Sequence, residues 1–357
     1  MPLASKPDVT VIGGGIFGLS CAWELTRRGA RVRLREAARI GAGASGGVVG
    51  ALAPHVPERW TAVKAFQFDA LIAAEAFWRD VAQTGGYDPG YARTGRLQPV
   101  ADDAALERAE ARGAAADTLW QGKARWSLRP AAEITDWAPQ TGVPWVIEDT
   151  LSARINPARA CAALAAALRA RGAEIAEGVT DAEDRPAAQT SILWATGAAG
   201  LGALSDAAGA EVGRGIKGQA AVLALDRRTA PQIYADGLHI VPHADGTTAV
   251  GSTTERDYDA HDATDGLLDD VIARARVAVP ALGNAPVLRR WAGLRPRARS
   301  RAPLLGPWPG RPGHFVANGG FKIGFGMAPG IARVMADLVL DGEDRIPEEF
   351  RLVLPTA

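Results

Sequence analysis

The chain has 357 residues, 47% of them hydrophobic, which is enough for two modest domains or one core with a large elaboration. Its 40 basic and 40 acidic side chains cancel, so the composition does not favour nucleic-acid binding or a membrane-surface role. Cys21 and Cys161 are too few and too far apart for a disulfide framework or a metal cluster, and they fit a reducing compartment. We expect a cytoplasmic protein with no metal, no signal peptide before Asp8 and no membrane-spanning segment.

The N-terminal residues predict a strand, a helix and a second strand. The short apolar run Asp8–Ile12 ends in glycines and predicts a buried parallel strand. Phe17–Gly29 has helical spacing and ends in basic residues and a glycine, as helices commonly do. Arg31–Arg35 predicts the second strand, which closes on Glu36. Together they form one βαβ unit.

The glycine motif of this unit predicts a dinucleotide site. In Gly13-Gly14-Gly15-Ile16-Phe17-Gly18, the first spaced glycine allows a tight turn, the second lets backbone approach a pyrophosphate, and the third lets helix pack on strand. The helix N-terminus offers free N–H groups to phosphates. A carboxylate at Glu36 can accept hydrogen bonds from ribose hydroxyls and would repel a 2′-phosphate. The context therefore favours dinucleotide binding over a plain tight turn.

Two further features favour FAD over NAD. Gly41–Gly50 is rich in small residues and follows Glu36 directly, which suits a longer ligand running past the sheet edge. Thr196-Gly197 after the strand Ser191–Ala195, and the stretch 318–326, are two more places where backbone can approach the same ligand. Gly197–Gly200 is too short, and its helix context too poor, for a second nucleotide fingerprint, so no NAD(P)H site is expected.

The remaining pattern predicts an α/β protein: a Rossmann-like FAD-binding domain and a second domain built on a mixed or antiparallel sheet. We assign residues 1–85, 150–210 and 285–357 to the FAD-binding domain, and 86–149 and 211–284 to the substrate-binding domain. Further helices are expected at Ala62–Thr84, Asn156–Gly172 and Pro329–Leu340, and further strands at Gly95–Val100, Ala173–Ala176, Ala220–Leu225, Leu238–Val241, Thr247–Ser252 and His314–Ala317.

These motifs, in this order, resemble the D-amino-acid oxidase family of FAD amine oxidoreductases, and are closest in pattern to glycine oxidase and sarcosine oxidase. Besides the N-terminal motif, the segments that carry the resemblance are Ala44–Gly46, Gly50–Leu52, Thr94–Leu97, Leu193–Gly197, Gly218-Gln219, Asp236–Pro242, Val250–Thr253, Trp291–Pro296 and Pro303–Gly306. The resemblance implies hydride transfer from the amine-bearing carbon of a small amino acid or N-methyl amino acid to the flavin. The imine is then hydrolysed to an oxo acid or aldehyde. No protein base is needed if the amine arrives neutral.

The resemblance also suggests catalytic residues. Arg295 takes the place of the arginine that grips the substrate carboxylate, although a structural arginine in a loop is the alternative. His239 stands where glycine oxidases have a tyrosine, and Lys322 where they have an arginine. His55 falls near the flavin region and is equally explained as a loop histidine. Arg297, Arg299 and Arg301 depart from the family pattern; a solvated edge or loop explains them better than a second acidic group on the substrate.

We predict non-covalent FAD, because no histidine occurs in Gly41–Gly50 and no cysteine in the C-terminal third. The predicted cofactor contacts are Gly13, Gly15, Ile16, Phe17, Gly18, Glu36, Ala37, Ala44, Ser45, Gly46, Val49, Gly50, Ala51, Val179, Ala195, Thr196, Gly197, Gly319, Gly320, Phe321, Lys322, Ile323 and Gly324.

Two alternatives to the amine oxidoreductase remain open. One is a flavin module that acts on a carboxymethylaminomethyl-modified tRNA base, against which the neutral charge argues. The other is a flavin-binding protein without catalysis. The sequence also leaves open the exact substrate, the electron acceptor (O2 or a carrier) and the oligomeric state.

Overall fold

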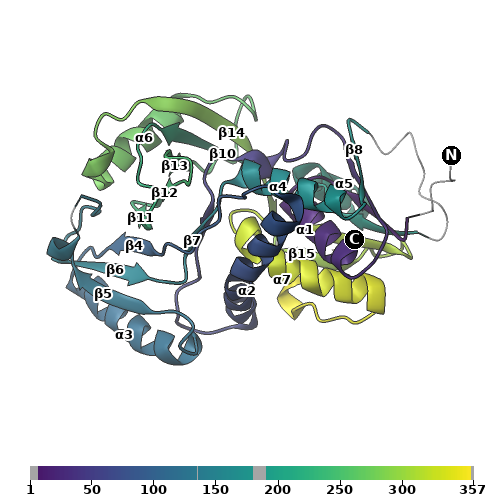
Figure 1. The fold of residues 1–357 in the computed structure, drawn as a ribbon, viewed down its shortest axis with the longest axis horizontal. Helices are drawn as coiled ribbons and strands as arrows, with labels where there is room; N and C mark the ends of the chain where they lie inside the picture. The colour runs from purple at the N-terminus through teal and green to yellow at the C-terminus, as the bar shows by residue number, and fades with distance from the viewer. Residues whose placement is uncertain (1–6, 135, 180–189, 355–357) are drawn as a thin grey trace.

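The computed structural model describes residues 7–134, 136–179 and 190–354, and it contains two large sheets (Figure 1). A six-stranded sheet lies toward one end of the molecule and an eight-stranded sheet toward the other. A short pair of strands, β3 (Ala51–Leu52) and β7 (Ala153–Arg154), lies between them. This arrangement confirms the expected α/β fold with a second, mixed-sheet unit. No helix in the described ranges is long and apolar enough to cross a membrane.

The six-stranded sheet is parallel except for one edge strand. β1 is buried along its whole length, as a central parallel strand requires, and α1 (Ile16–Arg27) connects it to β2. The predicted βαβ unit is therefore present. In spatial order the strands are β15 (Leu304–Pro307), β16 (His314–Asn318), β9 (Ser191–Trp194), β1 (Val9–Ile12), β2 (Val32–Glu36) and β8 (Glu174–Glu177), of which β15 is antiparallel.

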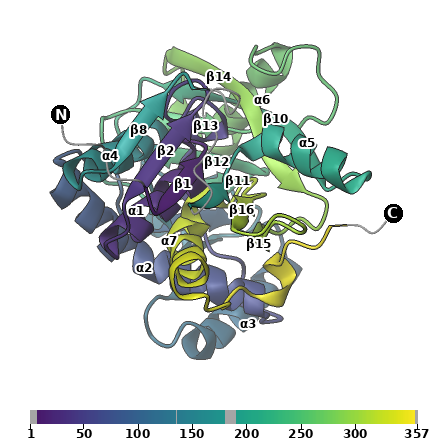
Figure 2. The ribbon, with the colours of Figure 1, turned by 90° about the vertical axis from the view of Figure 1, so that its right-hand side faces the viewer.

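Four helices pack together beside this sheet, and Figure 2 shows two of them, α1 and α7, side by side. Their buried faces supply most of the main core, which includes Leu19, Trp23, Leu164 and Met335. A fifth helix, α5, packs against β16 and against strands of the second sheet. Besides α1, these helices are α2 (Ala62–Gly85), α4 (Pro157–Ala170), α5 (Gly197–Ala208) and α7 (Gly324–Ala336).

Two helix predictions need correction. The last helix begins at Gly324 rather than near Pro329, which lies buried inside it and gives up one backbone hydrogen bond. The segment before it packs closely on α1, because a Cβ on Gly320 would lie 2.7 Å from the Phe17 ring. Gly197 does open a helix, α5, so the strand-turn-helix context judged poor from sequence is present there.

The eight-stranded sheet carries α6 (Gly266–Ala278) packed on its central strands and α3 (Asp103–Leu119) on its β5 edge. The second hydrophobic core of the protein lies against this sheet and contains Leu97, Ile233, Ile240 and Val250. In spatial order the strands are β14 (Val287–Ala298), β10 (Gly213–Leu223), β13 (Thr248–Gly251), β12 (Leu238–Pro242), β11 (Gln232–Ala235), β4 (Arg96–Pro99), β6 (Trp145–Asp149) and β5 (Trp126–Pro130).

The pairing of β14 differs from the predicted division of the chain. We assigned residue 285 onward to the FAD-binding domain, but β14 pairs with β10 from Ala298 back to Val287 and so belongs to the eight-stranded sheet. Both strands carry charged residues, such as Lys217 and Arg290, which disguised their length in the sequence. The remaining strands of this sheet come from 86–149 and 211–284.

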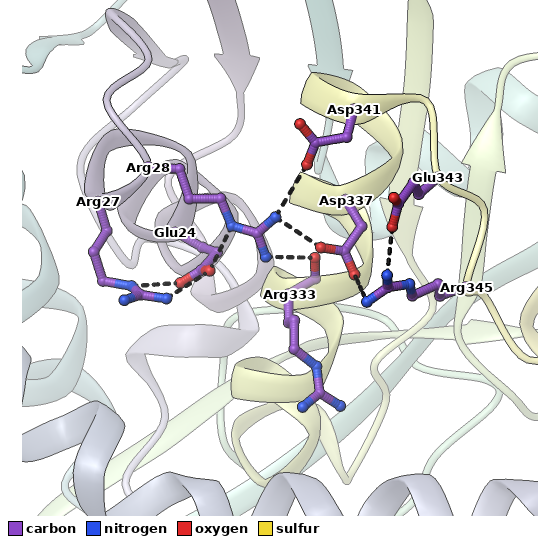
Figure 3. A network of polar contacts seen from close by, with 8 residues as sticks. All are labelled: Glu24, Arg27, Arg28, Arg333, Asp337, Asp341, Glu343 and Arg345. Atoms are coloured by element: carbon purple, nitrogen blue, oxygen red, sulfur yellow. Dashed lines mark hydrogen bonds and ion pairs between the residues drawn. The ribbon is translucent and has the colours of Figure 1, made fainter.

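An ion-pair network joins the C-terminal ends of α1 and α7 (Figure 3). Arg28 lies 2.8 Å from Glu24 and 2.7 Å from Asp337, whose side chain is only 8% exposed. Arg28 also donates to the carbonyl of Arg333. Because these two helices begin at the glycine-rich segments 13–15 and 319–324, the network ties together the supports of both segments.

Removing Asp337 should therefore destabilise the protein. Asp337→Ala removes one of the two buried carboxylates that pair with Arg28, the other being Glu24, and we expect the free energy of unfolding to fall by roughly 2 kcal/mol. Asp341→Ala is the matched control, since that side chain is 56% exposed and 3.5 Å from Arg28; its cost should stay below about 0.5 kcal/mol. Urea unfolding with saturating FAD measures both, and equal effects would contradict the prediction.

Candidate active site

A cavity of about 1090 Å³ runs along the carboxyl ends of the parallel strands and continues against the eight-stranded sheet. Ligands of open α/β sheets bind at this edge, beyond the ends of the strands. The cavity is lined by the ends of β1, β2 and β9, by the 42–51 loop and by the start of α7. Residues from β12 and β14 line its other part.

Most of the predicted cofactor contacts line this cavity although they are far apart in sequence. They come from the first glycine motif, the end of β2, the 44–51 segment, the end of β9 and the segment before α7. The predicted contacts in the lining are Gly13, Gly15, Ile16, Phe17, Glu36, Ala37, Ala44, Ser45, Val49, Gly50, Ala51, Val179, Ala195, Thr196, Gly197, Gly320, Phe321, Lys322 and Gly324.

Four predicted contacts, Gly18, Gly46, Gly319 and Ile323, are not in the cavity lining. A Cβ on Gly18 would lie 1.9 Å from the Gly13 carbonyl oxygen, and one on Gly46 would lie 2.3 Å from that of Gly41. These two glycines permit close backbone packing. Gly319, at φ +77°, turns the chain beside Ala302, and Ile323 packs against the main core.

The ends of β1 and β2 are held in a fixed geometry. The Glu36 carboxylate accepts hydrogen bonds from the backbone N–H of Gly14 at 2.7 Å and of Ala38 at 2.9 Å. The Ser45 hydroxyl accepts the Ile16 N–H at 2.9 Å, so one of the helix N–H groups expected to be free is already bound. The first turn of α1 contains no acidic residue that would offset the positive end of the helix.

Bare backbone in the lining fits an extended dinucleotide. Gly43 and Gly197 line the cavity, and a Cβ at either would meet no atom within 4 Å. At Gly15 the same test finds only the Ser45 hydroxyl, at 3.2 Å. At these three positions the cavity wall is bare backbone, which leaves room for a pyrophosphate and a ribityl chain.

The other part of the cavity brings Arg295, Lys322 and His239 together. Nη1 of Arg295 donates to the Thr253 carbonyl at 3.2 Å, and burial lowers the pKa of this guanidinium to about 10, which keeps it charged at neutral pH. Burial and the Arg295 charge both lower the pKa of Lys322. No carboxylate in the described ranges forms an ion pair with Arg295 or Lys322. The site therefore presents two cations.

His239 is a neutral member of this group. Burial, and secondarily the charges of Arg96, Lys322 and Arg295, lower the pKa of its imidazole to about 3. Its Nδ1 atom is buried and has no hydrogen-bond partner in the described structure. The Tyr234 ring lies 4.7 Å from the imidazole ring, centroid to centroid.

His55 and the late arginines lie outside the cavity lining. The backbone N–H of His55 donates to the Gln67 side chain, and burial lowers the pKa of its imidazole. The Arg297 guanidinium lies over the Phe321 ring at 5.6 Å, while Arg299 and Arg301 are exposed in the turn after β14. None of these four side chains lines the cavity, and Arg297 touches the site only through its contact with Phe321.

Several lining residues were missed in the sequence. Tyr234 faces His239 across the β11–β12 hairpin, and the Asp236-Gly237 turn would have predicted that pairing. Trp291 and Asn318 lay within recognised segments but were assigned no role. The lining also includes His261, Asp262, Trp308 and Arg311, for which the sequence carried no signal.

The lowered pKa of His239 makes a testable contribution to acid stability. The folded pKa of about 3 lies below the unfolded value, so the unfolded state binds this proton first and stability is lost as pH falls from 6.5 toward 3. We expect His239→Asn to remove about 1–3 kcal/mol of the stability loss measured between neutral pH and about pH 4.5. Denaturant unfolding at both pH values, with exposed His261→Asn as control, measures it; identical pH dependence in wild type and His239→Asn would refute the assignment.

The chain matches known proteins over most of its length. A family model described as "DAO: FAD dependent oxidoreductase" matches residues 8–338. The chain is 27% identical to a glycine oxidase from Geobacillus kaustophilus (strain HTA426) over 367 residues, covering 94% of each chain. It is 28% identical over 385 residues to the tRNA 5-methylaminomethyl-2-thiouridine biosynthesis bifunctional protein MnmC of Polaromonas naphthalenivorans (strain CJ2), covering 96% of this chain and 58% of that protein.

The fold comparison agrees with the family match. The crystal structure of glycine oxidase from Geobacillus kaustophilus superposes with a TM-score of 0.82 at 22% identity, covering 99% of this chain and 100% of that chain. The cavity lining of glycine-rich segments and the family match over most of the sequence lead to the same assignment. The protein belongs to the DAO family of FAD-dependent oxidoreductases.

Proposed function

We propose that this protein oxidises the C–N bond of a small amino acid or N-methyl amino acid of the glycine, sarcosine or D-amino acid type. The imine product then hydrolyses to an oxo acid or aldehyde. The observation that carries the proposal is Arg295, a half-buried, charged guanidinium in the cavity, with most of its N–H donors uncommitted among the described residues. The glycine oxidase relative supports the substrate class.

The cofactor site is assigned to the glycine-lined part of the cavity. Glu36 would hold the adenosine ribose, the 13–16 backbone and the N-terminus of α1 would hold the pyrophosphate, and the 44–51 segment would follow the ribityl chain. When bound, FAD supplies the acceptor for the hydride that leaves the substrate carbon.

Arg295 would orient the substrate. A planar guanidinium can grip a carboxylate with two parallel hydrogen bonds, which fixes both position and rotation of a small amino acid. Lys322, close enough for the Arg295 charge to lower its pKa, adds a second cation on the same side of the cavity. Trp291 and Phe321 add two aromatic side chains to the cavity lining.

The same charges would prepare the amine. The two cations disfavour a third positive charge, and the neutral His239 does not offset them, so they would lower the pKa of an ammonium group bound beside them. A neutral amine has the lone pair that must assist hydride departure. This arrangement removes the need for a protein base, and none of the described lining residues is placed as an obvious one.

Anaerobic mixing tests the proposal. The FAD-loaded protein should be yellow, and glycine, sarcosine, D-amino acids or N-methyl amino acids should bleach it. Repeating the reaction in air, with and without an artificial carrier, then identifies the electron acceptor.

The relationship to the tRNA-modifying bifunctional protein supports one other candidate, oxidation of a carboxymethylaminomethyl group on tRNA. Bleaching by suitably modified tRNA and by no free amine would favour it. Bleaching by neither class would favour a flavin-binding protein without catalysis.

A further inference from the structure

A polar array with Lys217 and Gln219 at its buried centre lies beside Arg295 and outside the cavity lining. The side chains of Lys217 and Glu255 are only 3% and 10% exposed, and their Nζ and Oε2 atoms lie 3.4 Å apart. Lys217 Nζ also lies 3.2 Å from Asp265. The Gln219 amide donates to Glu255 at 3.0 Å and to Asp265 at 2.8 Å. Such an array is rigid because each buried polar group fixes its neighbours.

Thr253 connects this array to Arg295. Its hydroxyl accepts the backbone N–H of Gln219 at 2.8 Å and forms a short hydrogen bond with Glu255. Its carbonyl oxygen accepts a hydrogen bond from Nη1 of Arg295 at 3.2 Å. The side chain of Thr253 is therefore held by the array, while its main chain holds the guanidinium.

The backbone of β10 lies directly against the Arg295 guanidinium. A Cβ added to Gly218, between Lys217 and Gln219, would lie 2.1 Å from the guanidinium atoms. The guanidinium thus rests on the β10 main chain at Gly218 and is tethered at Thr253. An arginine side chain loses conformational freedom when it is ordered, so an arginine that is already fixed in place avoids part of that cost on substrate binding.

We propose that Thr253 is a positioning residue for Arg295, and that Glu255, fixed by Lys217 and Gln219, holds the Thr253 hydroxyl in place. The inference rests on the proposed role of Arg295 as the carboxylate anchor. Charge alone predicts no weakening: removing the Glu255 anion would strengthen attraction for a carboxylate, and variants that keep its charge would leave that attraction unchanged. Weaker carboxylate binding after disruption of the array therefore reports positioning.

The test measures acetate binding to the FAD-loaded protein by calorimetry, in wild type and variants. Thr253→Val removes the hydroxyl but retains the main-chain carbonyl, and should raise the acetate Kd about three- to tenfold. Thr253→Ser keeps a hydroxyl and should stay within about twofold of wild type. Glu255→Asp keeps the negative charge and leaves Lys217 paired with Asp265, but it withdraws the carboxylate from Thr253. It should therefore behave like Thr253→Val, and it replaces that variant if Thr253→Val does not fold. Glu211→Gln, at an exposed carboxylate before β10, is the control.

The outcomes distinguish the positioning role of Thr253 from the role of Arg295 as carboxylate anchor. A rise in Kd for Thr253→Val or Glu255→Asp with recovery in Thr253→Ser supports the inference. Unchanged or tighter acetate binding in both disruptive variants, while Arg295→Ala loses it, overturns the positioning role and leaves the anchor intact. Acetate binding that Arg295→Ala does not alter overturns the proposed function and the inference with it.

Discussion

Replacing Arg295 with alanine is expected to lower kcat/KM for the best amine substrate by about 10²–10³-fold, equivalent to roughly 3–4 kcal/mol of transition-state stabilisation. The loss arises because the substrate carboxylate would enter a partly buried site without its charge-assisted partner, and because the reacting C–H would no longer be oriented. The apparent KM should rise sharply, and flavin reduction at saturation should slow.

The FAD content of Arg295→Ala should remain that of wild type, because Arg295 lies on β14 of the eight-stranded sheet. Arg297→Ala is the matched control on the same strand. It removes an arginine that stacks on Phe321, outside the cavity lining, and should change kcat/KM by less than about fivefold. Stopped-flow reduction and flavin absorbance measure these effects. Normal bleaching of Arg295→Ala would refute the anchor.

Gly218→Ala provides an independent route to the same result. The added methyl group would occupy the guanidinium position, so Arg295 must move although its charge is retained. A loss of substrate binding in Gly218→Ala with normal FAD content would therefore implicate the position of the guanidinium and not its charge alone.

The sequence predicted the residues that line the glycine-rich part of the cavity better than those around Arg295. The contacts around Gly13, Ser45, Thr196 and Gly320 were recognisable because backbone approach to a dinucleotide requires small residues at fixed places after strands, a local pattern. The cavity that these segments form matches the expected convergence of distant glycine-rich stretches.

The part around Arg295 depends on strand pairing, which a single sequence encodes weakly. Arg295 meets Thr253 only because β14 pairs with β10 and β10 with β13, and the length of β10 was hidden by the charged residue Lys217. That lysine is buried, and its cost is offset by two carboxylates that lie distant in sequence. His55, in contrast, follows the lining loop 42–51 closely in sequence, but its side chain lies outside the cavity lining.

Substituting alanine for Gly13 should abolish FAD binding, whereas the same substitution at Gly29 should not. Both glycines have positive φ, +112° and +93°, so each alanine costs about 1–2 kcal/mol of backbone strain. The two positions differ in their surroundings. A Cβ at Gly29 would meet nothing within 4 Å, but at Gly13 it would lie 2.4 Å from the carbonyl oxygen of Ala195.

The overlap at Gly13 must separate the ends of β1 and β9, two walls of the cofactor cavity that are paired along their length. We expect Gly13→Ala to purify without flavin absorbance, to bind added FAD at least about 100-fold more weakly, and to lose the ligand stabilisation of several kcal/mol that bound FAD confers. Gly29→Ala should be yellow, with a melting temperature a few degrees lower, about 2–4 °C. Absorbance, FAD titration and thermal unfolding distinguish them. If both variants retain FAD equally, the contact between the first glycine and the end of β9 does not control cofactor binding, and the glycine-lined cavity must hold its ligand by other segments.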